Sequence, residues 1–349
     1  MRFDWSVSPS STEVKVNRIL DADAVQLRSG SSPFLVVDSE VWRLWESEIV
    51  RAIRPEPAEV FTVDAREDLK TVRTVESLCA AMFESGTHRD GSLVAVGGGL
   101  TCDVAAFAAS IWLRGIELVL VPTTLLAMVD ACLGGKTGVN LAGAKNQIGS
   151  FYPAGLVVVA TDFLRTLPRA EVLQGMAEAL KTSVLADRDI AELLGSDVGK
   201  DRLPELVRRC LAAKGAIVAR DLRDLGGRRL LNLGHTLGHA LESSSGFEYS
   251  HGQAVGLGML GAAAMAARRG GRPALAGELR GILESIGLPV RLEGKVDPAA
   301  VTSFLDHDKK TGGDGRTWVL PYDWEDCRLE NLSPREEAAL LEVALGELR

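Results

Sequence analysis

The stretch SLVAVGGGLTCDVAAF, residues 92–107, joins an apolar run of strand type to a glycine turn and then to a helical pattern. Continuous apolar runs such as LVAV suit strands that are buried on both faces of a parallel sheet. A glycine turn after such a strand lets a phosphate approach the backbone N–H groups at a helix N-terminus. As a dinucleotide fingerprint the motif is incomplete, because Cys102 stands where the third glycine belongs. A dinucleotide site and a tight structural turn therefore both remain open at this point.

Apolar runs and helical patterns alternate outward from this stretch in both directions. Strand-type runs occupy residues 33–41, 92–99 and 116–124, and a helical pattern occupies residues 71–86. This spacing is typical of βαβ units, whose ligands bind beyond the carboxyl ends of the strands. From about residue 161, apolar residues recur at helical spacing. We therefore expect an α/β domain with a parallel sheet over residues 1–160 and a mostly α-helical domain over residues 161–349.

Composition narrows the class of protein. The 349 residues carry a formal net charge of −8 and are 46% hydrophobic, which is ordinary for a globular protein. The scattered lysines and arginines form no basic stripe, so nucleic acid is not an expected partner. The longest small-apolar run, GLGMLGAAAMAA from Gly256, is too short and too glycine-rich to span a bilayer, so no membrane partner is expected. The five cysteines form no CxxC pair, which favours free thiols in the cytoplasm.

Three of the five histidines cluster within 17 residues. His235 and His239 lie four apart in LNLGHTLGHALE, and His251 follows in HGQAV. HTLGH lacks the glutamate of HExxH, and two histidines on an apolar helix are more often core residues than ligands. A catalytic zinc usually takes three protein ligands, however, and Glu178 in GMAEALK is the best-placed carboxylate to join the cluster. Taken alone, Glu178 and Lys181 would read as a surface i,i+3 ion pair.

Two further segments offer groups for anions. LGGKTGVN, residues 133–140, ends like a Walker A motif, but Asp130 stands where that motif needs glycine and the preceding residues read as helix. A P-loop is therefore rejected, although Lys136 on its glycine turn could still bind an isolated phosphate. Arg228 and Asn232 lie four apart ahead of the histidine pair and supply donors suited to a carboxylate.

Together with further segments, these motifs form an ordered series that covers most of the chain. They are GGGLTCDVAAFAASIWLRG, PTTLLAMVDACLGGKTGVN, KNQIGSFYP, GMAEALK, LNLGHTLGHALE, HGQAV and HDKK. This ordered series, from about Val36 to Pro321, resembles the signature segments of the 3-dehydroquinate synthase family, which belongs to the sugar-phosphate cyclase superfamily.

The resemblance implies an α/β NAD-binding domain with a parallel sheet and a mostly α-helical C-terminal domain that binds metal and substrate. It implies a lyase that binds NAD and a divalent metal, zinc or cobalt, and cyclises 3-deoxy-D-arabino-heptulosonate 7-phosphate to 3-dehydroquinate with loss of phosphate. Such an enzyme acts in the shikimate pathway of aromatic amino acid biosynthesis. Glu178, His235 and His251 match the family's metal ligands, and His239 matches a histidine close to the substrate phosphate.

Other site residues are implied by matching positions in the family. The residues matched to NAD binding are Asp38, Glu67, Lys70, Gly97, Gly98, Gly99, Asp103, Thr123, Thr124, Asp130, Lys145 and Thr166. Those matched to the catalytic and phosphate pocket are Asp130, Lys136, Asn146 and Lys181, with Arg114 matching an arginine lent by the second subunit of a homodimer. Those matched to the carboxylate and ring contacts are Lys214, Arg228, Asn232 and one of Lys309 and Lys310.

Two positions depart from the family pattern, and three alternatives stay open. Gln253 stands where the family usually has glutamate, and Arg66 where a glycine is usual. The first alternative is an amino-dehydroquinate synthase or another sugar-phosphate cyclase of specialised metabolism, although Lys214, Arg228 and Asn232 argue against cyclases whose substrates lack a carboxylate. The second is a metal-dependent NAD alcohol dehydrogenase, which would release NADH. The third is a non-catalytic binding domain, which the many converging ionisable groups disfavour.

Overall fold

The computed structural model describes residues 1–5, 7, 10–27, 32–195, 201–246, 248–292, 298–308 and 315–349. The chain divides into two compact units. Unit 1 comprises Met1–Pro168 and Leu203–Arg223, and unit 2 comprises Arg169–Arg202 and Asp224–Arg349. The division that we predicted at residues 160 and 161 assigned residues 203–223 to the second domain, whereas in the structure this helix packs in unit 1.

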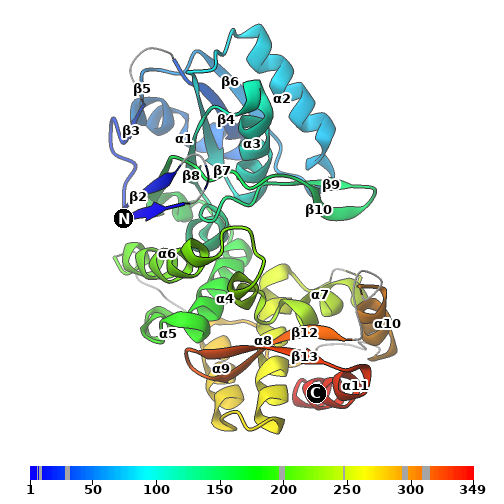
Figure 1. Cartoon of the computed structure of the whole chain (residues 1–349). Helices are drawn as coiled ribbons and strands as arrows, with labels where there is room; N and C mark the ends of the chain where they lie inside the picture. The colour runs from blue at the N-terminus through cyan, green and yellow to red at the C-terminus, as the bar shows by residue number, and fades with distance from the viewer. Residues whose placement is uncertain are drawn as a thin grey trace. The chain divides into compact units, whose positions relative to one another are not determined.

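A seven-stranded sheet forms the centre of unit 1 (Figure 1). Its strands, in chain order, are β1 (Arg2–Asp4), β2 (Ser11–Asn17), β4 (Phe34–Asp38), β6 (Glu59–Val63), β7 (Ser92–Gly97), β8 (Glu117–Pro122) and β11 (Leu156–Ala160). The spatial order is β1-β2-β11-β8-β7-β4-β6, and every neighbouring pair is parallel except β1 and β2. All residues of β4 and β7 are buried, as their continuous apolar sequences predict.

Helices and short strands complete unit 1. The helices are α1 (Ser39–Ala52), α2 (Val72–Glu84), α3 (Gly99–Ile111) and α6 (Leu203–Arg220), with shorter helical turns η1 (Glu67–Leu69), η2 (Trp112–Arg114), η3 (Ala127–Ala131) and η4 (Thr161–Arg165). The strands β3 (Val25–Gln26) and β5 (Ile53–Arg54) pair with each other, and β9 (Val139–Leu141) and β10 (Ala144–Ile148) form a hairpin. The helices α2 and α3 lie side by side.

The carboxyl ends of the parallel strands meet at one edge of the sheet. From β4 the chain continues to β6 on one side, whereas from β7 it continues to β8 on the other side. Such a reversal opens a crevice at the strand ends, where ligands of α/β proteins bind. Asp38 ends β4, and the glycine turn of residues 97–99 follows β7. The topology thus brings two separated candidate segments to one edge.

Unit 2 is built around one buried helix. Its elements are α4 (Arg169–Ala186), α5 (Asp189–Leu193), η5 (Gly227–Asn232), α7 (His235–Ser244), α8 (His251–Arg268), α9 (Ala274–Ile286), α10 (Pro298–Asp308), β12 (Arg316–Asp323), β13 (Asp326–Leu332) and α11 (Pro334–Glu347). Helix α8 contacts α4, α7, α9, α11 and β12. Residues 254–266 of α8 are all buried, which is why their sequence shows small and apolar side chains on every face.

Glycines let the backbones of α4, α7 and α8 touch. A Cβ atom on Gly258 of α8 would lie 2.0 Å from the carbonyl oxygen of Gly234, the residue that precedes α7. A Cβ on Gly252 would lie 2.6 Å from the Cα of Gln174 in α4. Gly234 itself has φ of +78°, a conformation that favours glycine. Larger side chains at these positions would therefore force the helices apart.

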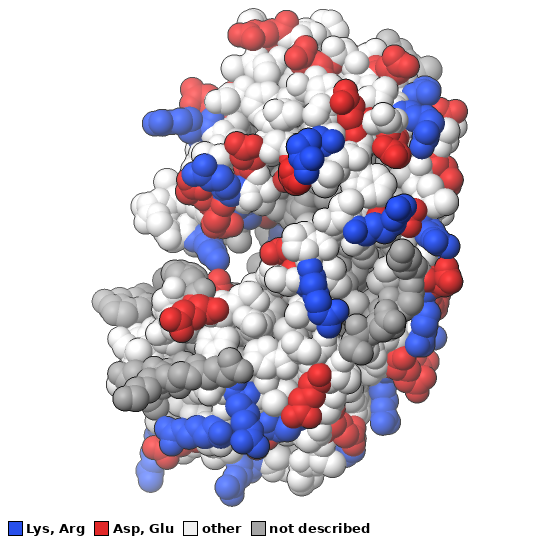
Figure 2. All heavy atoms as spheres, turned by 180° about the vertical axis from the view of Figure 1, so that it is seen from behind, with Lys and Arg blue, Asp and Glu red and all other residues white. Residues whose placement is uncertain are grey.

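The predicted fold class is confirmed, and the pattern missed several elements. The helical second part contains the antiparallel hairpin β12–β13, and unit 1 contains the hairpin β9–β10 and the antiparallel edge strand β1. The helix expected before Lys136 is present over residues 125–131, so the rejection of a P-loop holds. Within the described residues, no helix is long and apolar enough to cross a bilayer. Figure 2 shows acidic and basic side chains interspersed over one face.

Substituting the buried glycine Gly258 by alanine should destabilise the protein. Because the new Cβ would meet a backbone oxygen rather than a flexible side chain, we expect Gly258→Ala to lower the free energy of unfolding by about 2 kcal/mol or more. Gly277 in α9 is exposed with nothing within 4 Å of its Cβ direction, so Gly277→Ala should stabilise by about 0.5–1 kcal/mol. Urea denaturation measures both. Equal effects of the two substitutions would contradict the packing.

Candidate functional site

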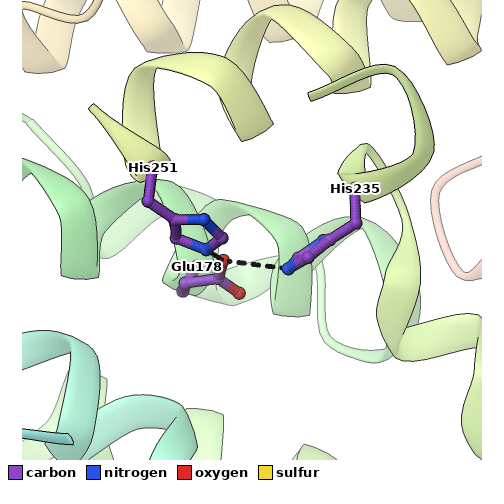
Figure 3. A group of neighbouring side chains, drawn as sticks. All are labelled: Glu178, His235 and His251. Carbon is purple, nitrogen blue, oxygen red and sulfur yellow. Dashed lines mark hydrogen bonds and ion pairs between the residues drawn. The ribbon is translucent and has the colours of Figure 1, made fainter. Parts of the chain in front are cut away.

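Three side chains of unit 2 converge to form a candidate metal centre (Figure 3). Glu178 comes from α4, His235 begins α7 and His251 begins α8. Glu178 Oε1 lies 3.6 Å from His235 Nε2 and 3.2 Å from His251 Nε2, and the three ligand atoms all lie within 4.8 Å of one another. Two imidazoles and one carboxylate are the donor set of many catalytic zinc sites, which keep further positions open.

Hydrogen-bond partners orient both imidazole rings. His235 Nδ1 lies 3.1 Å from the carbonyl oxygen of Leu233, which accepts a hydrogen bond only if Nδ1 carries the proton. His251 Nδ1 lies 3.8 Å from Glu242 Oε2, a buried carboxylate of α7. Both arrangements direct Nε2 toward Glu178, and such outer contacts are a usual feature of histidine ligands.

The two carboxylate oxygens of Glu178 contact different partners. Oε1 faces the two histidines, whereas Oε2 forms an ion pair with Lys181 one turn along α4. Both partners are buried, so the expected surface ion pair is wrong as a description of this site. Burial raises the pKa of Glu178, but Lys181 and the two histidines outweigh it and hold the pKa well below its ordinary value. Glu178 is therefore a carboxylate.

The two histidines differ in charge. Burial lowers the pKa of His235 to about 3, so its imidazole is neutral and ready to act as a ligand. Burial also lowers the pKa of His251, but hydrogen bonds to Glu178 and Glu242 outweigh it and raise the pKa to about 9. His251 lies between the carboxylates of Glu178 and Glu242, and a divalent cation at Nε2 would bind in exchange for the proton there. The residues fit a divalent metal.

His239 lies beside the cluster without joining it. Its ring centroid is 5.3 Å from that of His235 and 6.1 Å from that of His251. Glu178, His235 and His251 are the only group of His, Cys, Asp and Glu ligand atoms with metal-binding spacing in the described part of the chain. The structure thus places one histidine of the helical pair in the candidate metal group and the other beside it, and the roles of the two stay predictions.

The remaining candidate residues of unit 2 lie near the N-terminus of α7. Arg228 is buried in η5, and Asn232 ends η5 three residues before His235. Gln253 forms a capping box with Ser250 at the start of α8, because its Oε1 accepts the Ser250 N–H at 2.9 Å. A glutamate could make the same bond, so this departure preserves the cap that positions His251. Lys309 and Lys310 lie outside the described residues.

In unit 1 the glycine turn leads directly into α3. Gly98 is the N-cap residue and offers no side-chain acceptor, so the first-turn N–H groups have no side-chain cap. A Cβ on Gly98 would lie 3.0 Å from Thr124 Cγ2, and Thr123 donates its N–H to the Gly97 oxygen at 2.9 Å. The turn and Thr123–Thr124 are thus adjacent, and the uncapped helix start fits a pyrophosphate.

Three other predicted cofactor residues contact elements of the same sheet edge. Asp38 caps α1 by accepting the N–H groups of Glu40 and Val41 at 3.0 Å. Thr166 accepts a hydrogen bond from Trp45 Nε1 at 3.0 Å. Asp103 lies in the second turn of α3, where burial raises its pKa against the opposing effect of Lys70. These contacts give the side chains structural roles alongside any ligand role.

A polar cluster joins η1, α3 and the hairpin β9–β10. Lys70 Nζ donates to Asp103 Oδ2 and to Asn146 Oδ1, both at 2.6 Å. Asn140 Nδ2 donates to Glu67 Oε1 at 2.8 Å, and Asn140 Oδ1 accepts the Asn146 N–H at 2.9 Å. The structure therefore brings together Glu67, Lys70 and Asp103, which were matched to NAD binding, with Asn146, which was matched to the catalytic and phosphate pocket. Lys145 is exposed on the same hairpin, and Arg66 pairs with Asp68 at the surface.

Another ion pair of unit 1 lies at η3. Lys214 of α6 donates to Asp130 Oδ1 and to the Asp130 carbonyl oxygen, both at 2.5 Å. Asp130 belongs to a turn with π-helical hydrogen bonding, a local form that is frequent at functional sites. The family match groups Lys214 with Arg228 and Asn232, which lie in unit 2, and does not predict the ion pair of Lys214 with Asp130. Lys136 is exposed on the adjoining glycine turn.

Sequence reasoning missed two residues of these clusters. Glu242 occurs in the quoted segment GHALE, seven residues after His235, and this helical spacing is the one signal that could have placed it on the histidine face of α7. Asn140 ends the quoted segment KTGVN, but its partners at residues 67 and 146 come from two other segments. Such nonlocal pairing has no signature in the sequence.

Comparisons with known families and curated proteins agree over most of the chain. A profile described as 3-dehydroquinate synthase N-terminal matches residues 60–174, and one described as 3-dehydroquinate synthase C-terminal matches residues 175–311. The 3-dehydroquinate synthase of Thermobifida fusca (strain YX) is 44% identical over 255 residues, which cover 71% of this chain and 69% of that protein. That of Alkaliphilus metalliredigens (strain QYMF) is 34% identical and 88% of each chain is covered.

Solved structures show the same architecture. A 2-deoxy-scyllo-inosose synthase complexed with carbaglucose-6-phosphate, NAD+ and Co2+ has a TM-score of 0.82 at 26% identity, with 96% of each chain covered. A 2-epi-5-epi-valiolone synthase from Streptomyces hygroscopicus subsp. jinggangensis 5008, with NAD+ and Zn2+ bound, has a TM-score of 0.80 at 28% identity, with 95% of this chain and 96% of that chain covered. A probable glycerol dehydrogenase from Sinorhizobium meliloti 1021, with a TM-score of 0.58 at 17% identity over 93% of this chain and 96% of that one, shares the fold alone.

The two histidines His251 and His239 should differ in their effect on metal binding. Removing a ligand from a three-ligand site should lower zinc affinity by roughly 100-fold or more, so His251→Ala should lose zinc on dialysis. His239→Ala should retain about one zinc per chain. Elemental analysis after dialysis measures both proteins, with circular dichroism as the control for folding. Equal zinc loss in the two variants would overturn the ligand assignment.

Proposed function

The chain belongs to the 3-dehydroquinate synthase family, and from this premise we propose which role each group of residues has in the reaction. The enzyme is a phosphate-eliminating cyclase that converts 3-deoxy-D-arabino-heptulosonate 7-phosphate to 3-dehydroquinate, a step of aromatic biosynthesis. It uses NAD and a divalent metal ion. The observation that carries the assignment of roles is the cluster of buried Glu178 with His235 and His251 in unit 2.

We assign the dinucleotide to the carboxyl edge of the unit 1 sheet. The uncapped start of α3 after Gly97–Gly98 would bind the pyrophosphate, with Thr123 and Thr124 beside it. NAD bound there would supply reversible hydride transfer at one carbon of the substrate, so that the carbon is oxidised and later reduced in the same turnover. The residues proposed to hold it are Asp38, Glu67, Lys70, Gly97, Gly98, Gly99, Asp103, Thr123, Thr124, Asp130, Lys145 and Thr166.

We assign the metal to Glu178, His235 and His251. These residues would hold a divalent metal, which would supply polarisation of substrate oxygens and help to orient the substrate. Lys181 holds Oε2 of Glu178, which leaves Oε1 directed at the two histidines. Glu242 holds His251 through Nδ1. These buried contacts fix the ligands before substrate arrives, which lowers the entropic cost of forming the reactive complex.

The residues proposed to bind the substrate phosphate are cationic and neutral donors. They are Lys136 and Asn146 of unit 1, Lys181 and His239 of unit 2, and Arg114 of a partner subunit, and each would act through charge-assisted hydrogen bonds. Oxidation of the substrate makes the neighbouring C–H acidic, and the phosphate held by these groups can itself accept that proton before it leaves. Asp130 and Lys214 form an ion pair that would keep both groups charged and oriented. One of Lys309 and Lys310 is proposed to contact the ring.

A carboxylate on the substrate is proposed to bind Arg228 and Asn232, with Lys214 as a further cation. Arg228 is buried, and Asn232 belongs to the same short η5 segment, which leads into the metal ligand His235. A guanidinium in such a place binds a carboxylate through two parallel hydrogen bonds. The solved neighbours are named for products without a carboxylate, so these residues are the proposed basis of selectivity for a keto-acid.

A homodimer is proposed in which each subunit lends Arg114 to the other. Arg114 is exposed and forms no hydrogen bond or ion pair with any described residue. The apolar side chains of Ile111, Leu113 and Phe151 around it are exposed by 49%, 42% and 38%. Ser150 bonds Ser110 at 2.8 Å, which places Phe151 beside this turn. Exposed apolar groups around an unpaired cation are typical of an interface.

The proposed location is the cytoplasm, where five free cysteines stay reduced.

The overall reaction is redox-neutral, which gives the first test of this function. With the purified enzyme, zinc and the seven-carbon keto-acid phosphate, one phosphate should be released per carbocycle formed, and absorbance at the NADH band should not rise with turnover. Assaying the amino analogue beside the oxo substrate tests the alternative amino-dehydroquinate synthase, and we predict that the oxo substrate is preferred. Stoichiometric NADH without phosphate release would instead favour a dehydrogenase.

Selectivity for the carboxylate should depend on Arg228. Arg228 can give a substrate carboxylate charge-assisted hydrogen bonds that a neutral sugar phosphate cannot use, so sedoheptulose 7-phosphate, which lacks that group, should react with kcat/KM lower by roughly 10³-fold or more. Arg228→Leu should lower kcat/KM for the keto-acid phosphate, and with it the ratio of this kcat/KM to that for sedoheptulose 7-phosphate. Zinc content of the variant is the control, because Arg228 is not a proposed ligand. Equal rates of the wild type on both substrates would rule out the carboxylate role.

Mixing two inactive variants tests the shared Arg114. Arg114→Ala and Glu178→Ala should each be nearly inactive as homodimers. A mixed dimer contains one complete site, so co-expression should restore about a quarter of wild-type activity at random pairing. Analytical ultracentrifugation verifies the dimer. If the mixed dimers form and stay inactive, Arg114 acts within its own chain or not at all.

A further inference from the structure

Asn140 occupies a position between two segments that are far apart in sequence and close in unit 1. One is the η1 segment, which carries Glu67 and Lys70, and the other is the hairpin β9–β10, which carries Asn146. The backbone N–H of Asn140 donates to the Lys70 oxygen at 2.8 Å, so β9 is anchored to the end of η1 by the main chain. Its side chain is therefore held between the two segments.

The two ends of the Asn140 amide perform different functions. Its Nδ2 group donates to Glu67 Oε1 at 2.8 Å and to the Glu67 carbonyl oxygen at 3.3 Å. Its Oδ1 accepts the backbone N–H of Asn146 at 2.9 Å. Only an amide supplies both a donor and an acceptor in this arrangement, whereas a carboxylate supplies acceptors alone.

The bond to Asn146 restrains a strained residue. Asn146 has φ of +54°, in the left-handed region that few side chains other than asparagine tolerate. In this conformation its side-chain oxygen accepts a hydrogen bond from Lys70 Nζ at 2.6 Å, and the same ammonium pairs with Asp103. The Asn140 oxygen thus holds the backbone that presents Asn146 to Lys70.

We propose that Asn140 is a positioning residue that couples the NAD-binding segment of Glu67 and Lys70 to the hairpin that carries Lys145 and Asn146. The coupling rests on the proposed NAD site of unit 1. Binding of the dinucleotide to Glu67 and Lys70 then orders the hairpin, and an ordered hairpin in turn strengthens NAD binding, because a coupling between two sites acts equally in both directions.

Two substitutions separate the two ends of the amide. Asn140→Asp keeps the acceptor for the Asn146 N–H but removes the donor and places a carboxylate against Glu67. We expect NAD affinity to fall roughly tenfold, with kcat at saturating NAD within about twofold of the wild type. Asn140→Ala removes both ends, so NAD affinity and kcat should each fall roughly tenfold or more. Gln147→Ala, on the same hairpin, is the matched control and should leave both unchanged.

Hydrogen exchange of the NAD-free protein provides a second readout. The amides of residues 139–148 should exchange faster in Asn140→Ala than in the wild type, whereas Asn140→Asp should keep their protection. Zinc content should be the same in all variants. The coupling is overturned if NAD binds the wild type and both variants within twofold, or if the hairpin exchanges equally in all proteins. If the wild type binds no NAD, the proposed function fails, and hairpin exchange still decides whether Asn140 holds Asn146.

Discussion

The contact between the backbones of α7 and α8, made by glycine, is the constraint on which the metal centre depends. Gly258 touches the carbonyl oxygen of Gly234, and Gly234 directly precedes His235. At the start of α8, Gly252 directly follows His251 and touches Gln174, one turn before Glu178 on α4. Each ligand is thus next to, or one turn from, a point where two backbones meet. Close packing of this kind leaves the ligands little freedom to move apart.

The charges of the centre depend on this packing. Glu178 and Lys181 are buried together, and such a pair is stable only when both partners are held in good geometry. The same burial keeps His235 neutral, whereas His251 shares a proton with Glu178 and Glu242. The site therefore carries two buried carboxylates around histidines, which favours a divalent cation over an empty state. Because Gln253 is neutral, the negative charge beside the histidines comes from Glu178 and Glu242. Gln253 still caps α8.

The sequence predicted the fold class and singled out three candidate ligands that the structure brings together, because both have local or family signals. Continuous apolar runs such as that of β7 indicate buried parallel strands, and the ordered motifs point to Glu178, His235 and His251 as candidates. The packing of α6 in unit 1 could not be predicted in this way, because helical periodicity does not show which sheet or helix a helix packs against. The Lys214–Asp130 pair follows from that packing. Asn140 and Glu242 were missed because their partners lie on other segments. The hairpin β12–β13 was missed because its apolar pattern is short.

The central claim is that Glu178, His235 and His251 together hold one divalent metal ion while His239 stands apart. Crystals of the full chain grown with zinc, measured at the zinc absorption edge, test this directly by anomalous scattering. The account predicts one strong peak per chain at about 2.0–2.2 Å from Glu178 Oε1, His235 Nε2 and His251 Nε2, with His239 beyond bonding distance. A peak bonded to His239 in place of one of these ligands, or no peak at this cluster with zinc in excess, would contradict it.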